Sequence, residues 1–393
     1  MARWLWLFCV QSSMTSDCLM IWELVVYGAL MVDVAGTRLN KADIELIGQM
    51  QVGGIILFAR NVQSPEQVRE LCDAIRQVKR QSISQKSTHQ ETVNETTVNE
   101  TTINQQILVA VDQEGGRVAR LQEGFSPLPA MGAIGQRFET DPCHALRLAY
   151  HAGYLMAAEV LAVGIDFSFA PVLDLNGISQ VIGDRSFHAK PQVVIALAGE
   201  FIHGMKSAGM ASTGKHFPGH GSVAPDSHVA MAVDDRCYDD IANQDLLPFM
   251  RHLPWLDALM PAHVIFSQVD DRPAGFSRIW LQQIIRQKLG FDGVLFSDDL
   301  SMKAAHVAGD VTKRVQAAIS AGCDMALVCN DAQSAMQAAQ FATCLPMPNQ
   351  SRLANMAGNI PVWQGCLAST AAQFPLYSDA KASIADFMAS LTS

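Results

Sequence analysis

Residues 142–172 read PCHALRLAYHAGYLMAAEVLAVGIDFSFAPV. The pattern over Pro142–Val163 predicts a helix, and the apolar run Asp166–Val172 that follows it predicts a strand. This run is apolar almost throughout rather than alternating, which is typical of parallel strands that helices cover on both faces. The stretch therefore predicts one helix-to-strand step of an α/β fold.

The same step recurs on both sides of this stretch. Further helices are predicted at Ser64–Arg80, Gln192–Ala208 and Arg278–Leu289. The predicted strands are Leu30–Val34, Gly54–Phe58, Ile107–Val111, Asp166–Val172, Ala211–Lys215, Ala258–His263, Val294–Ser297 and Met325–Cys329. About eight such units in roughly 300 residues predict a single TIM-like (β/α)8 barrel. A doubly wound open sheet is the alternative fold, but no dinucleotide-binding glycine fingerprint follows any of these strands.

Composition narrows the class of protein. The chain has 393 residues, of which 49% are hydrophobic and 17% charged, so a globular protein is expected rather than a disordered one. Its net charge of −10 argues against a nucleic-acid partner, which would require a basic patch. The nine cysteines are scattered and form no C-x-x-C pair, which favours a reducing cytoplasm over a disulfide framework.

Three segments are expected to lie outside the barrel of residues 28–345. Residues 1–27 form an N-terminal extension, in which Trp4–Val10 is a short apolar run without a cleavage site; an export signal and a later start at Met14 or Met20 are the alternatives. No stretch there is long enough to span a membrane. Residues 81–106 are polar and contain a tandem pentapeptide, which predicts a flexible surface insertion. Residues 346–393 are predicted to be a helical tail packed on the barrel.

Polar residues gather just after the strand ends, where barrel enzymes carry their catalytic groups. Asp112 follows the third strand directly, at the start of a polar cluster that extends to Arg120, and is the better of the two carboxylates in this cluster as a substrate ligand. A solvated loop with internal ion pairs is an equally possible interpretation of the cluster. Arg185 follows the fourth strand. Its guanidinium could bind a sugar hydroxyl or a carboxylate, or pair with Asp184 or Asp174.

Residues 215–228 read KHFPGHGSVAPDSH and form the most informative cluster. Lys215 and His216 stand at a strand end and are hard to explain by packing, whereas His220, flanked by glycines, could simply shape the loop. Asp226 lies two residues before His228. A carboxylate beside a histidine can orient it and make it more basic, so His228 is a candidate for proton transfer.

Two adjacent carboxylates, Asp298 and Asp299, follow the seventh predicted strand. Successive side chains of an extended backbone point in opposite directions, so only one should face the barrel axis. Asp298 is expected to be the nucleophile or ligand, and Asp299 to pair with backbone or to cap the next helix. Capping by both is the alternative.

These residues alone leave three function classes open. A metal-dependent hydrolase would use His216, His220, His228 and an Asp, although the H-x-H and H-E-x-x-H spacings are missing. A glycosidase would use Asp298 as covalent nucleophile together with a separate acid/base group. A non-catalytic sugar-binding barrel is the third class.

Eight motifs then occur in one order along the chain. They are Gly53–Asn61, Val111–Arg120, Phe169–Asp174, Val181–Phe187, Lys215–His228, Met260–His263, Phe296–Met302 and Ala321–Met325. In these motifs the chain resembles the family 3 glycoside hydrolases, specifically the bacterial β-N-acetylglucosaminidases of peptidoglycan recycling. The resemblance covers about residues 28–345, and residues 1–27 and 81–106 depart from the family pattern.

The resemblance implies a single barrel that needs no metal or other cofactor and retains anomeric configuration. It implies that Asp298 is the nucleophile and that His228, with Asp226 as its partner, is the acid/base. Histidine is unusual in that role, because most retaining glycosidases use a carboxylic acid.

The implied sugar-binding residues are Asp112, Arg120, Arg185, Lys215 and His216. They would hold the terminal GlcNAc of peptidoglycan fragments such as GlcNAc–1,6-anhydro-MurNAc peptides. The similar members are compact and cytoplasmic, so a cytoplasmic monomer without nucleic-acid or membrane partners is expected.

Overall fold

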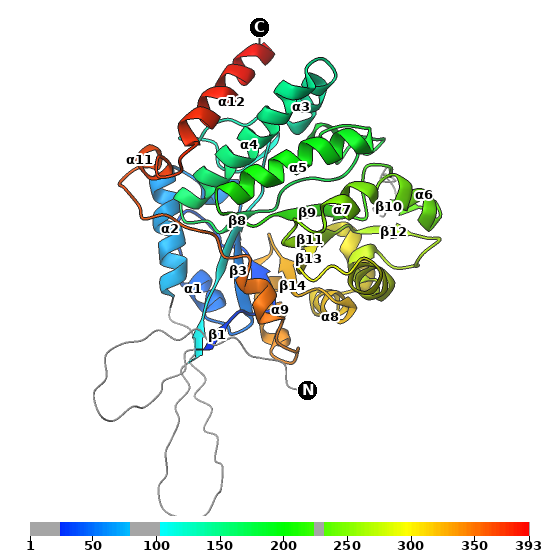
Figure 1. The fold of residues 1–393 in the computed structure, drawn as a ribbon. Helices are drawn as coiled ribbons and strands as arrows, with labels where there is room; N and C mark the ends of the chain where they lie inside the picture. Colours follow the sequence, from blue (N-terminus) through cyan, green and yellow to red (C-terminus); the bar gives the residue numbers. More distant parts are fainter. Residues whose placement is uncertain (1–23, 79–102, 224–231, 393) are drawn as a thin grey trace, which may run out of the picture.

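The computed structural model describes residues 24–78, 103–223 and 232–392. Its centre is an eight-stranded parallel sheet (Figure 1). In spatial order the strands are β8 (Phe167–Ser168), β5 (Leu108–Val111), β3 (Val52–Leu57), β2 (Leu30–Val32), β14 (Met325–Val328), β13 (Val294–Asp299), β11 (Ala258–Pro261) and β9 (Thr213–Phe217). Each of the eight predicted strands is present.

Backbone hydrogen bonds close this sheet between its two ends. Thr213 N donates to Ala170 O at 2.7 Å, and Leu173 N donates to Lys215 O at 2.7 Å. Val172 and Lys215 also form a parallel bridge. The strands therefore follow one another around a closed ring in sequence order. This confirms the (β/α)8 barrel and excludes the open doubly wound sheet.

Helices surround the barrel (Figure 1). Those that follow the successive barrel strands are α1 (Lys41–Ile47), α2 (Pro65–Gln77), α4 (Pro142–Ala162), α5 (Pro191–Ser207), α7 (Leu247–His252), a wide π-type helix Ile279–Lys288, α8 (Val311–Ala321) and α9 (Ala332–Ala342). The start of α4 follows from sequence, because the Asp141 side chain accepts from His144 N at 3.0 Å and Pro142 occupies the first turn.

Several shorter helices and strands lie in the loops between the barrel strands and the main helices. They are α3 (Met131–Phe138), α6 (Tyr238–Asn243), the antiparallel pair β6 (Gln113–Gly115) and β7 (Val118–Ala119), the parallel pair β10 (Ala232–Asp234) and β12 (Val264–Phe266), and short 3-10 helices at Ala59–Asn61, Gly183–Arg185, Ala274–Phe276 and Lys303–Ala308. The turn at Gly183–Arg185 carries Arg185, and the candidate residues Asp112 and Arg120 flank the β6–β7 pair.

The C-terminal segment contains α10 (Gln350–Ala354), α11 (Leu367–Ala371) and α12 (Tyr377–Thr392). α12 lies against α4 (Figure 1). Tyr377 Oη donates to Glu159 Oε1 at 3.0 Å, which joins the two helices through a buried carboxylate.

Two segments that the sequence places outside the barrel pair with each other. β1 (Leu24–Val26) lies parallel to β4 (Ile103–Gln105). The last residues of the predicted insertion 81–106 are therefore strand rather than flexible loop, because the backbone there has a partner. Residues 1–23 and 79–102 lie outside the described residues. In the described part of the chain, no helix combines the length and apolar character that a membrane crossing requires.

Candidate active site

A cavity of about 230 Å³ lies at the carboxyl ends of the barrel strands. Its polar lining residues are Asp112, Glu114, Arg120, Arg185, Lys215, His216, His220, Asp298 and Asp299. Six sequence-predicted site residues are among them and are brought together from the ends of four strands, β5, β8, β9 and β13. The other two, Asp226 and His228, lie outside the described residues.

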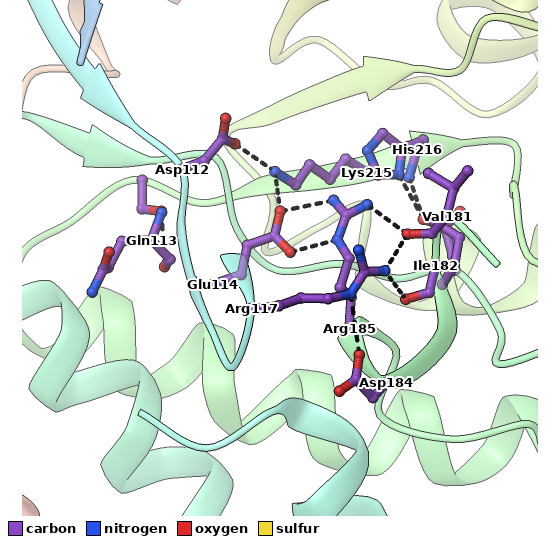
Figure 2. Close-up of polar contacts among 12 residues, drawn as sticks. Asp112, Gln113, Glu114, Arg117, Val181, Ile182, Asp184, Arg185, Lys215 and His216 are labelled. Carbon is purple, nitrogen blue, oxygen red and sulfur yellow. Dashed lines mark hydrogen bonds and ion pairs between the residues drawn. The ribbon is translucent and has the colours of Figure 1, made fainter. Parts of the chain in front are cut away.

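Glu114 links two cations of this cavity (Figure 2). Its Oε1 lies 2.6 Å from Lys215 Nζ, and Arg185 donates to both carboxylate oxygens at 2.8 and 2.9 Å. Burial opposes the ionisation of Glu114, but Lys215 and Arg185 outweigh it and lower its pKa to about 2. Glu114 is therefore ionised and holds both cations in place.

Lys215 makes a second ion pair, with Asp112 Oδ1 at 2.8 Å (Figure 2). Burial lowers the pKa of Lys215, but Asp112 and Glu114 outweigh it and raise that pKa. The lysine is thus a fixed cation. Asp112 Oδ2 has no hydrogen-bond partner among the described residues, so this oxygen is available to a ligand.

Arg185 forms an ion pair with Glu114 and with neither Asp184 nor Asp174, the two partners that the sequence suggested. Besides its fork on Glu114, its Nη1 donates to Val181 O at 3.2 Å, whereas Asp184 pairs with Arg117 at 3.4 Å (Figure 2). Arg120 differs from Arg185: its Nε is buried and has no partner within the described residues. Its backbone N–H donates to Gln113 Oε1 at 2.8 Å, which holds its stretch of the chain beside the cavity.

Asp174 orients His216. The carboxylate accepts from His216 Nδ1 at 2.7 Å, from His216 N at 3.1 Å and from His220 N at 2.7 Å. Burial raises the pKa of Asp174, but His216 outweighs it and that pKa is lowered. An ionised carboxylate only accepts, so Nδ1 of His216 carries the proton and its Nε2 is left for a ligand.

The two adjacent carboxylates of β13 have different partners. Asp299 accepts from Ser301 N at 2.9 Å and from Ser301 Oγ at 2.6 Å, whereas Asp298 Oδ1 accepts only from Asp299 N, at 2.8 Å, among the described residues. Both border the cavity, but the carboxylate oxygens of Asp299 already accept hydrogen bonds from Ser301. Burial raises the pKa of Asp298, yet nearby His263 and His216 outweigh it and hold that pKa below its ordinary value. Asp298 is thus the anionic carboxylate with an available oxygen.

Sequence reasoning missed three contributors. Glu114 could have been found, because residues two apart on an extended chain share a face and Glu114 stands two after Asp112. Asp174 and His263 lie in quoted motifs, but nothing in the sequence tells which histidine faces which carboxylate. His263 Nε2 lies 3.2 Å from Asp299 O, beside the nucleophile candidate.

The alternative of a metal-dependent hydrolase has no support in the ranges that the structure describes. No group of three or more His, Cys, Asp or Glu side chains there is arranged to hold an ion. The Nδ1 atoms of His216 and His220 face Asp174 and Ser179, respectively.

Residues 83–350 match the family model described as the glycosyl hydrolase family 3 N terminal domain. The chain belongs to glycosyl hydrolase family 3. It is a glycoside hydrolase, and the resemblance drawn from the eight motifs is confirmed. The family 3 chain is 52% identical to the beta-hexosaminidase of Pseudomonas aeruginosa over 332 residues, covering 84% of this chain and 91% of that protein.

Two further relatives are similar to this family 3 chain. The beta-hexosaminidase of Thiobacillus denitrificans is 48% identical over 84% of this chain and 87% of its own length. The crystal structure of NagZ from Neisseria gonorrhoeae in complex with N-trifluoroacetyl-D-glucosamine superposes with a TM-score of 0.78 at 36% identity, covering 93% of this chain and 99% of that one.

Proposed function

We propose that this family 3 enzyme is a retaining exo-β-N-acetylglucosaminidase that releases terminal non-reducing GlcNAc from peptidoglycan fragments such as GlcNAc–1,6-anhydro-MurNAc peptides. The observation that carries this proposal is the ionised, accessible Asp298 inside a cavity of oriented donors. The beta-hexosaminidase relatives and the glucosamine derivative bound by the similar NagZ support the choice of sugar.

In the proposed reaction, Asp298 attacks the anomeric carbon while His228 protonates the leaving oxygen. His228 then removes a proton from the water that releases GlcNAc, and two displacements at one carbon retain its configuration. Asp226 would orient His228 and raise its basicity. An imidazole suits the acid role because its ordinary pKa lies near working pH.

The sugar-binding residues would act through the atoms that their ion pairs leave free. Asp112 Oδ2 and His216 Nε2 can accept or share hydrogen bonds with sugar hydroxyls, while Arg120, Arg185 and Lys215 donate. Because Glu114 and Asp174 fix three of these side chains beforehand, little orientational entropy remains to be lost when the sugar binds.

The nucleophile is tested with Asp298→Ala and with a 2-fluoro glycosyl trapping reagent. We expect turnover of p-nitrophenyl N-acetyl-β-glucosaminide to fall by about 10⁴-fold or more, because alanine cannot form the glycosyl ester. The control Asp184→Asn, at the exposed Arg117 pair, should keep wild-type activity. Trapping of the label on a residue other than Asp298, found by peptide mass spectrometry, would disprove the assignment.

The acid/base is tested with His228→Ala on two substrates. General acid catalysis contributes about 10²–10⁴-fold, so hydrolysis of the natural fragments should fall by that amount. The nitrophenyl substrate, whose leaving group needs little protonation, should lose far less in the first step. Equal losses on both substrates would argue against His228 as the proton donor.

The other two function classes make different predictions. A metal-dependent hydrolase would lose activity after exhaustive treatment with EDTA and regain it with the metal; we expect unchanged activity. A sugar-binding barrel would release no p-nitrophenol. We also propose that the protein is a cytoplasmic monomer; the seven free cysteines of the described residues support the reducing compartment.

A further inference from the structure

His220 borders the catalytic cavity, although the sequence left it as a possible loop-shaping residue. Its backbone N–H donates to Asp174 Oδ1 at 2.7 Å, and its ring meets that of His216 edge-on, with centroids 6.2 Å apart. The backbone of His220 is thus held by the same carboxylate that orients His216. None of these contacts uses the ring nitrogens of His220.

Ser179 determines which ring nitrogen carries the proton. Its Oγ lies 3.3 Å from His220 Nδ1 and has no other hydrogen-bond partner among the described residues; the serine is 2% exposed. If Nδ1–H donated to Oγ, the buried hydroxyl proton would lack an acceptor. If the hydroxyl donates to Nδ1, both groups are satisfied. The second arrangement leaves the proton of a neutral ring on Nε2.

Nε2 is then a donor at the cavity. It has no hydrogen-bond partner in the described part of the chain, and Asp298 is close enough to influence the ring. Burial lowers the pKa of His220, so the neutral imidazole predominates near pH 7. A neutral N–H donor suits a sugar oxygen.

We propose that His220 is a substrate-binding residue whose Nε2–H donates a hydrogen bond to an oxygen of the bound sugar, with Ser179 fixing the required tautomer. The identity of the sugar as GlcNAc rests on the proposed function. The hydrogen bond itself rests on the Ser179 contact and on the place of the ring in the cavity.

Two variants of His220 separate binding from loop shaping. The amide nitrogen of glutamine reaches the position of Nε2, whereas that of asparagine reaches only the position of Nδ1. We expect His220→Asn to lower kcat/KM by about ten- to a hundredfold, because it leaves the sugar oxygen unpaired in an enclosed site. His220→Gln should retain activity to within about tenfold. The reverse order would show that His220 acts through the Ser179 contact and would overturn the proposal.

A second experiment introduces Ser179→Ala into the wild type and into the His220→Asn variant and compares the two losses in kcat/KM. In the wild type it should cost about three- to tenfold in kcat/KM, because the ring is no longer held in one tautomer and orientation. In the His220→Asn background it should cost less than twofold, since no ring remains to orient. Equal costs in both backgrounds would contradict the proposal. Thermal unfolding of each variant checks that the fold is intact.

Calorimetric binding of N-acetylglucosamine separates this inference from the proposed function. If the wild type binds N-acetylglucosamine and His220→Asn weakens that binding at least tenfold while no glycoside is hydrolysed, the inference stands and the function fails. If the wild type hydrolyses the glycoside and His220→Asn matches it in both binding and turnover, the function stands and the inference fails. If the wild type neither binds nor hydrolyses, both are wrong.

Discussion

Glu114 completes a cluster of charges in the cavity that is neutral as a whole. Two carboxylates, Asp112 and Glu114, face two cations, Arg185 and Lys215, so the charges of this cluster cancel. The cluster therefore offers fixed hydrogen-bond donors and acceptors but has no net charge. Such an arrangement binds a polar neutral ligand without having to expel a counterion, which suits a sugar better than a phosphate.

The buried charge of Glu114 makes stability depend on pH. Its pKa of about 2 lies below the ordinary value of 4.5, so its contribution is present above pH 4.5 and is lost as pH falls toward 2. Glu114→Gln mimics the protonated form. We expect this variant to be less stable than the wild type by about 3 kcal/mol at pH 7 and by about half of that at pH 3.

Urea unfolding at several pH values measures this difference. Glu139→Gln is the matched control, because Glu139 also pairs with a lysine, Lys190, but does so at the exposed surface; its stability difference should be unmeasurable at every pH. A Glu114→Gln difference that does not shrink between pH 7 and pH 3 would mean that packing, not charge, explains the loss.

Pairings at the residue scale could not be predicted, although the residues could. Six of the eight predicted site residues line the cavity, and they could be selected because burying polar side chains directly after apolar strands is costly unless those side chains are used. Glu114 and Arg185 are 71 positions apart, and Asp174 and His216 are 42 apart. Which of these side chains come into contact depends on the register between strands of the barrel and on the direction in which each side chain points. The local sequence does not determine either.

At the scale of elements, burial explains what was predictable. Barrel strands lie between core and helices, so their apolar runs are continuous and easy to find. The ends of these strands are harder to predict. Asp166–Val172 was predicted as one strand, but only Phe167–Ser168 is regular. Pro171 has no N–H to donate, and the ladder resumes where Leu173 N bonds Lys215 O. The short helices α6 and α7 escaped prediction because they are too brief to show a period.

The attachment of α12 to α4 gives an element-scale prediction. Glu159 is buried and accepts from Ser126 N at 2.9 Å, Ser126 Oγ at 2.6 Å and Tyr377 Oη at 3.0 Å. Tyr377→Phe removes one of three donors, so we expect the free energy of unfolding to fall by about 1–2 kcal/mol in chemical denaturation, with kcat/KM unchanged.

The control is Tyr238→Phe, which keeps the ring contacts with Trp280 and Lys288. Tyr238 Oη makes no hydrogen bond to any described residue, so this variant should stay within about 0.5 kcal/mol of the wild type. A loss of activity in Tyr377→Phe would show that α12 influences the cavity, contrary to its place on the outside of the barrel.

For the whole molecule, the net charge of −10 acts on charged ligands before they reach the cavity. The proposed natural substrates carry peptide carboxylates, whereas p-nitrophenyl N-acetyl-β-glucosaminide is neutral. Salt screens the repulsion of the anionic substrates, since the Debye length falls from about 30 Å at 0.01 M to about 8 Å at 0.15 M.

We therefore expect kcat/KM for anionic muropeptides to rise about two- to fivefold over that range of sodium chloride, and kcat/KM for the neutral glycoside to change less than about twofold. Steady-state assays of both substrates in the same buffers measure this, with the neutral glycoside correcting for any effect of salt on the enzyme itself. A muropeptide kcat/KM that falls with salt would mean that cations at the cavity mouth attract the peptide more strongly than the whole molecule repels it. The local charge of the mouth, and not the net charge, would then set the rate of encounter.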